Sequence, residues 1–184
     1  MENSYIIGEV HTYMNQLKEK MSIWLNKVFP QITDNWWDEL VIHNLSPIQL
    51  ENVNSKGTCE LTGLDLAALL RVFSKNWFLI INRTYVNTKV RHYIGSMATI
   101  RNDWAHITGE EIAKDKVISD VEIIIELMQT FDATMSETRR MEKFIMDIED
   151  DVEIPDKPVK KGPIISVPPH TNTLALEIKI GSVT

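Results

Sequence analysis

An apolar stripe through the first 28 residues is the feature that most restricts how this chain can fold. Its members recur every three or four residues, which is the spacing of one face of an α-helix. The pattern therefore predicts one long amphipathic helix, which Ser4 can cap at its start and which Pro30 ends. The residues of this stripe are Ile6, Val10, Met14, Leu17, Met21, Trp24 and Val28.

The chain between residues 62 and 106 predicts two further helices. Thr62 and Asp65 form a capping-box pattern, which places the start of one helix there and its end near Ile81. Asn87 is expected to cap the next helix, which should end near His106. The inward-facing residues are Leu66, Leu69, Leu70, Phe73, Trp77 and Ile80 in the first helix, and Val90, Tyr93 or Ile94, Met97, Ile100 and Trp104 in the second.

Helices are also predicted after residue 106. Thr108 and Glu111 form another capping-box pattern, so a helix should begin at about Gly109. An additional helix is expected over residues 134–148. The predicted fold is therefore all-α, an antiparallel bundle of four or more helices joined by connections of the usual length. The inward-facing residues of the helix after Gly109 are Val117, Val121, Ile124, Ile125, Met128 and Phe131.

The hexapeptide Arg101-Asn102-Asp103-Trp104-Ala105-His106 carries residue types that RNA cleavage requires. Imidazole titrates near neutral pH and can transfer protons, and a guanidinium supplies a permanent charge in a fork that matches phosphate oxygens. A five-residue offset places the side chains of Arg101 and His106 about 140° apart around a helix, which suits a site shared between two helices or two subunits. The same pair also occurs by chance in helical proteins as a surface cation and a core imidazole, so spacing alone leaves both interpretations open.

The net charge of −7 argues against nucleic-acid binding, but its distribution along the chain argues for it. The segment 83–106 is basic, whereas the segments on both sides of it carry more acidic than basic residues. Because charges farther away than a Debye length of about 8–10 Å are largely screened, such a segment can attract a phosphate backbone. A solvated helix face would have the same composition. The candidate RNA-binding residues are Arg83, Lys89, Arg91 and His92.

The hexapeptide resembles the Arg-Asn-x-x-x-His motif of the HEPN superfamily. The likeness extends to the long first helix, to Trp36-Trp37, and to the Leu-rich stretch Leu64–Leu70 that precedes Trp77-Phe78. Over residues 4–133 the chain is similar to the Swt-type branch of that superfamily. The resemblance implies a helical bundle at residues 1–133 and a metal-independent endoribonuclease of a prokaryotic defence, toxin or RNA-surveillance system.

The resemblance also implies roles for the motif residues. Two bundles would pair through their motif helices, so that Arg101 and His106 of both subunits line one cleft. His106 would transfer protons while the substrate's own 2′-hydroxyl attacks, Arg101 would bind the scissile phosphate, and Asn102 would orient His106 or bind the phosphate. Asp103 is either a partner that holds the imidazole tautomer or a solvated carboxylate. The alternative function is a non-catalytic dimerisation or RNA-docking module that regulates an attached ATPase or helicase.

Residues 149–184 differ in composition from the rest of the chain. Glu149–Glu153 is nearly all acidic, and residues 155–169 hold five of the seven prolines, which predicts an extended linker. Residues 174–180 alternate between apolar and polar side chains, which predicts a single β-strand. A lone strand must pair with another copy, lie on the bundle, or begin a further domain. The resemblance favours the last of these, because such bundles often precede an ATPase or helicase-like module.

Composition restricts the remaining classes of protein. A chain of 184 residues with 43% hydrophobic content should form one domain with a tail. Cys59 is the single cysteine, and His11, His43 and His170 have no neighbours at metal-ligand spacing. We therefore expect the protein to bind no metal or cofactor. We expect these three histidines to be structural or solvated. No secretory leader and no long apolar run is present, which predicts a cytoplasmic location without membrane insertion.

Overall fold

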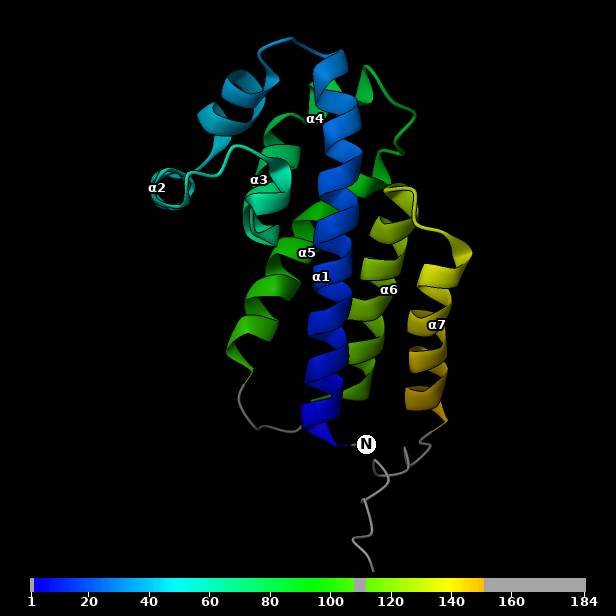
Figure 1. Ribbon diagram of the computed structural model, residues 1–184. Coiled ribbons are helices and arrows are strands. Elements are labelled where there is room, and N and C mark those ends of the chain that lie inside the picture. The colour runs from blue at the N-terminus through cyan, green and yellow to red at the C-terminus, as the bar shows by residue number, and fades with distance from the viewer. Residues whose placement is uncertain (1, 108–111, 151–184) are drawn as a thin grey trace, which may run out of the picture. The chain divides into compact units, whose positions relative to one another are not determined.

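Helix α1, Asn3–Val28, packs against several other helices in the computed structural model, which describes residues 2–107 and 112–150 (Figure 1). It packs most extensively against α3 and α6, and it also contacts α5 and α7. Shorter turns of 3₁₀ or π-helix cover Phe29–Gln31, Trp37–Val41, Ile42–Asn44 and Leu61–Gly63. The other helices are α2 Pro47–Lys56, α3 Leu66–Lys75, α4 Trp77–Ile81, α5 Lys89–His106, α6 Lys114–Thr130 and α7 Met135–Glu149.

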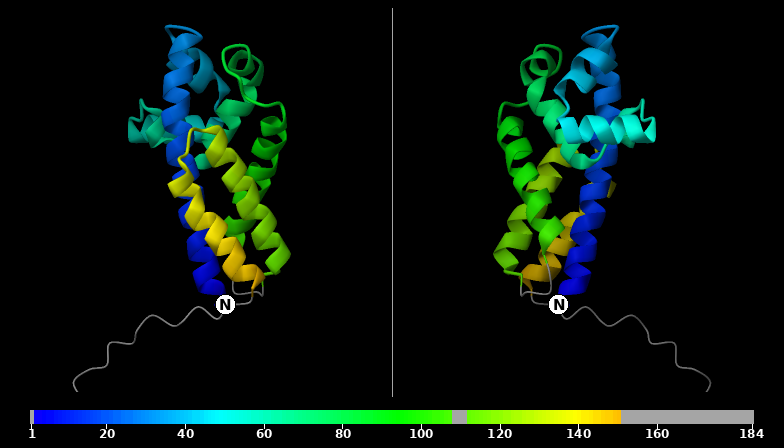
Figure 2. Two further views of the ribbon diagram at one scale, coloured as in Figure 1. Left: turned by 90° about the vertical axis from the view of Figure 1, so that its right-hand side faces the viewer. Right: turned by 90° about the vertical axis from the view of Figure 1, so that its left-hand side faces the viewer.

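The four longest helices alternate in direction along the chain. Helix α5 runs antiparallel to α1 and to α6, and α7 runs antiparallel to α6 (Figures 1 and 2). The carboxyl end of α5 therefore lies near the amino-terminal half of α1. No residue in the ranges 2–107 and 112–150 belongs to a β-strand. The prediction of an all-α antiparallel bundle is confirmed.

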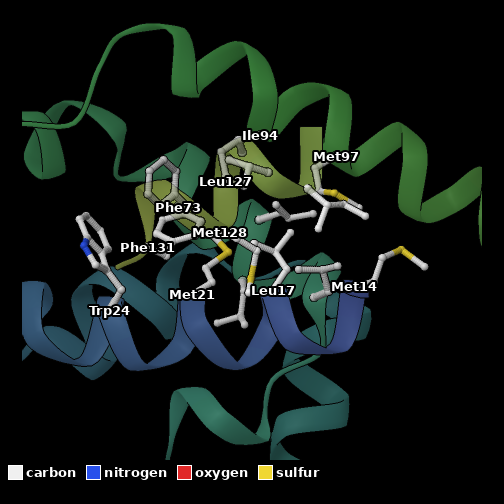
Figure 3. Close-up of a cluster of buried hydrophobic side chains, with 14 of the residues drawn as sticks. Met14, Leu17, Met21, Trp24, Phe73, Ile94, Met97, Leu127, Met128 and Phe131 are labelled. Carbon is white, nitrogen blue, oxygen red and sulfur yellow. The ribbon is translucent and has the colours of Figure 1, made fainter. Parts of the chain in front are cut away.

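The core forms where α1, α3, α5 and α6 meet (Figure 3). Trp24 of α1 and Phe73 of α3 both contact Phe131, which follows α6, with ring centroids 5.4 and 5.7 Å apart in edge-to-face arrangements. Edge-to-face contacts are favourable because the positive ring edge meets the negative ring face. Every residue of the predicted stripe in α1 is buried, as are all the residues predicted to face inward from α3, α4 and α6. In α5, where the sequence left Tyr93 or Ile94 as the inward-facing residue, Ile94 is the buried one, with 2% of its surface exposed.

Two of the predicted helix boundaries in the first half of the chain are wrong. Ser4 lies inside α1, which begins one residue earlier without a side-chain cap. Thr62 lies in a 3₁₀ turn, and it is Asp65 that caps α3 by accepting a hydrogen bond of 2.7 Å from the Ala68 backbone N–H. A carboxylate at this position satisfies one of the free N–H groups of the first turn.

The helix predicted to run to Ile81 is divided at Asn76. This side chain is 3% exposed, and its amide donates to the backbone carbonyls of Leu40 (2.7 Å) and Val72 (2.8 Å). Amide side chains that bond to nearby carbonyls compete with the regular helix pattern. Asn76 therefore ends α3, turns the chain into α4, and ties both to the π-helical turn Trp37–Val41.

The predicted end of α5 agrees with the structure, but the predicted start of the helix that follows it does not. Helix α5 ends at His106 as predicted. Thr88 rather than Asn87 is the residue that directly precedes α5, but the Asn87 side chain still accepts a hydrogen bond of 2.9 Å from the Lys89 backbone N–H in the first turn. Helix α6 begins at Lys114, five residues later than the predicted start at Gly109. The predicted capping box Thr108–Glu111, the linker 155–169 and the strand 174–180 lie outside the described residues. Among the helices that are described, none combines the length and the apolar character needed to cross a lipid bilayer.

Helix α7 is held against α1 by polar and aromatic contacts. Arg140 donates to the Glu9 carboxylate at 2.6 and 2.9 Å, and Lys20 lies 2.6 Å from Glu137. Hydrogen bonds from Lys20 and from the Thr134 backbone lower the pKa of Glu137 to about 2. The rings of Tyr13 on α1 and Phe144 on α7 also meet, edge to face at 5.6 Å. These contacts fix α7 on the side of α1 that faces away from α3.

Candidate functional site at the carboxyl end of α5

The hexapeptide Arg101–His106 forms the last turn and a half of α5. Its side chains divide into two groups according to their surroundings. Trp104 is 1% exposed, whereas Asn102, Asp103 and His106 are exposed and Arg101 is half-buried. The division lets one part of the hexapeptide anchor the helix while the other part faces solvent.

The anchor is a hydrogen-bonded network between α5 and α6. The indole N–H of Trp104 donates to Asp120 Oδ2 at 2.7 Å, and Lys116 Nζ lies 2.9 Å from Asp103 Oδ2 and 3.0 Å from Asp120 Oδ2. Burial lowers the pKa of Lys116, but its hydrogen bonds to Asp103 and Asp120 outweigh this effect and raise the pKa overall. Asp120 is itself 6% exposed, so its charge requires these partners. Asp103 thus holds α5 against α6 and neither contacts the imidazole of His106 nor stands free in solvent.

Arg101 lies on the side of α5 that faces α3 and α1. Its Nη1 donates to Asn102 Oδ1 at 3.1 Å, and its Nη2 lies 4.0 Å from Asp65 Oδ2. An ion pair of that length between half-exposed groups contributes little to stability. Arg101 is therefore available to an incoming anion, and Asn102 contacts Arg101 rather than His106.

His106 is the last residue of α5 and has no hydrogen-bond or ion-pair partner in the part of the chain that the structure describes. It lies about 140° around the helix from Arg101, since each residue turns the helix by about 100°. The two side chains therefore leave the helix at different edges. A ligand that touches both must lie against the exposed end of α5 or against a second copy of it.

Two hollows adjoin Arg101, and both are lined by basic residues. One, of about 300 Å³, lies between α3 and α5 and includes Arg71, Lys75 and Asn102. The other, of about 380 Å³, lies between α1, α3 and α5 and includes His11 and Lys18. His106 lines neither of them. Arg101 is shared by the two hollows, so it occupies the middle of a basic band that crosses three helices.

The sequence predicts a structural or solvated role for His11, and the structure brings it to the motif. Its Nε2 lies 3.2 Å from the backbone carbonyl of Trp104, which is 93 positions away in sequence. It also lines the hollow that contains Arg101. The sequence holds no local signal for this contact, because it depends on how α1 packs against the end of α5.

Residues 12–132 match the family model described as Swt1-like HEPN. The chain belongs to this HEPN family. The match includes the whole of α5 with its hexapeptide and stops before α7, and it begins one residue after His11. Comparison with curated proteins and with solved structures gives no match. Membership indicates a nuclease-related or RNA-related module, and HEPN domains commonly dimerise and bind RNA.

The predicted RNA-binding residues of this HEPN domain lie away from the motif. Lys89, Arg91 and His92 are exposed in the first turn of α5, and Arg83 is exposed in the turn after α4. Arg91 and Arg101 are ten residues apart, which is about 15 Å along a helix. The structure therefore places these four residues at the opposite end of α5 from His106, and the Arg91 guanidinium lies over the Phe78 ring at 5.5 Å from its centroid.

The outward face of α5 connects the two ends of the helix. Its exposed side chains are small in the middle, and a Cβ added at Gly95 would meet no other atom within 4 Å. Such a face allows another helix to approach closely. It is also polar at both ends, where a bound RNA could contact it. Its exposed residues are Arg91, Gly95, Ala98, Thr99, Asn102 and His106.

In the described part of this HEPN domain, no three His, Cys, Asp or Glu side chains come close enough together to hold a metal ion. The single cysteine, Cys59, is exposed in the loop after α2.

Proposed function

We infer that this HEPN domain is an endoribonuclease that cuts RNA through Arg101 and His106 in a cleft between two copies of the chain. The observation that carries the proposal is the division of the hexapeptide. Asp103 and Trp104 make its structural contacts, whereas His106 makes none among the described residues and Arg101 makes weak ones. A polar pair that the fold does not use for stability is available for a ligand. A defence, toxin or RNA-surveillance role would follow from such an activity.

The chemistry uses groups that RNA and the motif already contain. The 2′-hydroxyl oxygen attacks the adjacent phosphorus, a new O2′–P bond forms, and the P–O5′ bond breaks. The 2′-hydroxyl loses its proton to an imidazole, and the leaving 5′ oxygen receives one from an imidazolium. Arg101 binds the phosphate oxygens and stabilises the charge that develops on them. Asn102 keeps the Arg101 guanidinium in place by accepting its hydrogen bond.

A dimer explains how two side chains at different edges of one helix can act together. If two α5 helices pack through their outward faces, His106 of one copy comes close to Arg101 of the other. The small side chains at the middle of this face support the arrangement, as does the exposure of His106. Two-fold pairing would also give the site two imidazoles, one for each proton transfer.

The products of cleavage test this mechanism. Purified protein incubated with single-stranded RNA should leave 2′,3′-cyclic phosphate and 5′-hydroxyl ends, and cleavage should continue in excess chelator. DNA, and RNA methylated at the 2′ position of the cut site, should resist because they lack the nucleophile. Mass spectrometry of the fragments identifies the ends. Ends with 5′-phosphate and 3′-hydroxyl, or complete inhibition by chelator, would assign the activity to a metal site and remove the role of His106.

Gly95→Gln tests the dimer. The added side chain has open space within one copy and improves helix propensity by about 0.5–1 kcal/mol, so folding should be retained. In a dimer packed through α5, the same side chain lies in the interface. Light scattering at tens of micromolar protein should show a dimer for the wild type and a monomer for Gly95→Gln, with cleavage lost in the variant. Gly8→Gln is the matched control, since Gly8 also lies in a helix with no atom near its added Cβ. Wild-type protein that is monomeric and still cuts RNA would contradict the shared cleft.

A second candidate function is supported by the position of His106 outside both hollows. In this alternative the HEPN domain binds RNA along α3 and α5 without cutting it, dimerises, and regulates an attached ATPase or helicase. The product assay separates the two candidates, because a docking module would bind the RNA and leave it intact.

A further inference from the structure

The hollow between α1, α3 and α5 lies beside Arg101 and contains two basic or titratable side chains of α1, His11 and Lys18. We propose that it binds one unstacked nucleotide of the RNA next to the scissile phosphate, with His11 and Lys18 as its contacts. The proposal rests on the RNA function inferred above and assigns it a binding site on α1. We call this hollow the α1 subsite; it is lined by His11, Asn15, Lys18, Asp65, Arg101 and Ala105, with Met14 and Leu66 at its apolar floor.

The hydrogen bond of His11 determines which atoms it can offer to a ligand. Its partner is a backbone carbonyl, which can only accept, so Nε2 must carry the hydrogen. In a neutral imidazole the other nitrogen, Nδ1, is then an acceptor without a hydrogen. The carbonyl belongs to Trp104, in the last turn of α5, where carbonyls lack a partner within the helix. His11 therefore caps the motif helix through one nitrogen and keeps the other for a ribose hydroxyl or a base N–H.

The charges around the α1 subsite suit a phosphate. Lys18 is half-buried on α1 and makes no ion pair with another described residue, and Arg101 enters from α5. The opposing charge is Asp65 on α3, but one of its oxygens is occupied by the Ala68 N–H. Its other oxygen is 4.0 Å from Arg101 Nη2, so a phosphate can replace it as the partner of the guanidinium. The groups that face His11 are thus Lys18, Asp65 and Arg101, with a net positive charge.

The size and lining of the α1 subsite favour a single nucleotide. A volume of about 380 Å³ is at the lower end of the range found for small-molecule sites. Its lining combines the apolar side chains of Met14 and Leu66 with the polar side chain of Asn15. Apolar side chains can pack against the face of a base, and a polar side chain can form a hydrogen bond with its edge. A nucleotide enters such a hollow only when it is splayed out of a helix. Single-stranded RNA is therefore the occupant that the geometry favours.

The binding experiment uses protein in the His106→Ala background, so that the RNA stays intact whether or not the wild type cuts it. The probe is a fluorescein-labelled single-stranded uridine octamer, read by fluorescence anisotropy. Lys18→Met should weaken binding about five- to tenfold and reduce the slope of log Kd against log salt by about 0.7, because one phosphate contact is lost. Lys27→Met is the matched control, since it removes the same charge from the other end of α1, and it should bind like the parent protein.

His11→Gln separates recognition from structure. The glutamine amide can still donate to the Trp104 carbonyl, so the melting temperature should stay near that of the parent protein, while the Nδ1 acceptor is lost. Binding should weaken about threefold or more, as expected for one lost hydrogen bond. His43→Gln, at an exposed site in the turn before α2, should have no effect.

Asp65→Asn provides a change of the opposite sign. Asparagine caps a helix about as well as aspartate, so α3 should be retained, but the competing carboxylate disappears from the α1 subsite. RNA should bind about two- to fivefold more tightly, as expected when a like charge near a phosphate is removed. If Lys18→Met, His11→Gln and Asp65→Asn all bind like the parent protein, the RNA does not enter the α1 subsite. If they behave as expected but the wild type cuts no RNA, the subsite stands and the endoribonuclease proposal fails.

Discussion

His106→Ala should lower the rate of RNA cleavage by about 10²–10⁴-fold, the range expected when a general acid–base group is removed. The folded state should be almost unaffected, because His106 is exposed and has no partner among the described residues. Surface substitutions of this kind change the free energy of unfolding by about 0.5 kcal/mol or less. Initial cleavage rates and circular dichroism melts on the same preparations measure the two effects. Arg101→Ala should give a comparable loss, since it removes the charge that faces the phosphate.

The matched control for this pair is His43→Ala, which removes an exposed histidine in the turn before α2. It should cut RNA at the wild-type rate. Mixing Arg101→Ala with His106→Ala protein should recover part of the activity, because a mixed dimer contains one copy of each intact side chain. Unfolding of both single variants would show that the pair is structural, and active single variants would exclude it from the chemistry.

Trp104→Ala should lower the free energy of unfolding by about 3–5 kcal/mol, the range found when large buried aromatics are truncated. Trp104 is 1% exposed and donates its indole N–H to Asp120, so the change leaves a cavity and removes a partner from a buried carboxylate. The loss should be visible as a lower midpoint in urea denaturation, followed by tryptophan fluorescence of the remaining residues.

Trp104→Phe separates the two contributions. It keeps most of the ring but removes the donor, and it should cost about 1–3 kcal/mol, the penalty of a buried acceptor that loses its hydrogen bond. A loss from Trp104→Phe as large as that from alanine would assign the effect to the Asp120 contact alone. Wild-type stability in Trp104→Ala would contradict the anchoring role of the hexapeptide's interior.

The helical core could be predicted from the sequence because its signal is local. An apolar residue every three or four positions defines one helix face wherever that face is later buried, and the stripes of α1, α3, α5 and α6 were confirmed on this basis. The break at Asn76 could not be predicted in the same way. Its amide bonds to Leu40, which is 36 positions away, and that contact exists only after the chain has folded.

The candidate site shows the same limit. Residue chemistry identified Arg101 and His106, and helix geometry placed them at different edges. The partners that decide their surroundings come from other helices: His11 from α1, Asp65 from the cap of α3, and Lys116 from α6. No spacing rule links these residues to the hexapeptide. Long charged side chains also have several rotamers, so the pairing of Asp103 with Lys116 depends on how α5 and α6 pack.

The position of α1 has a consequence for synthesis of the protein. Its stripe is made first, but its partners on α6, such as Leu127 and Met128, follow roughly a hundred residues later (Figure 3). Ribosomes add about 5–20 residues per second, so the stripe of a nascent chain lacks these partners for about 5–20 s. During that interval the apolar face of a 26-residue helix is open to chaperones and to neighbouring nascent chains. Helix α1 can therefore bury its whole apolar face only after α6 has been synthesised.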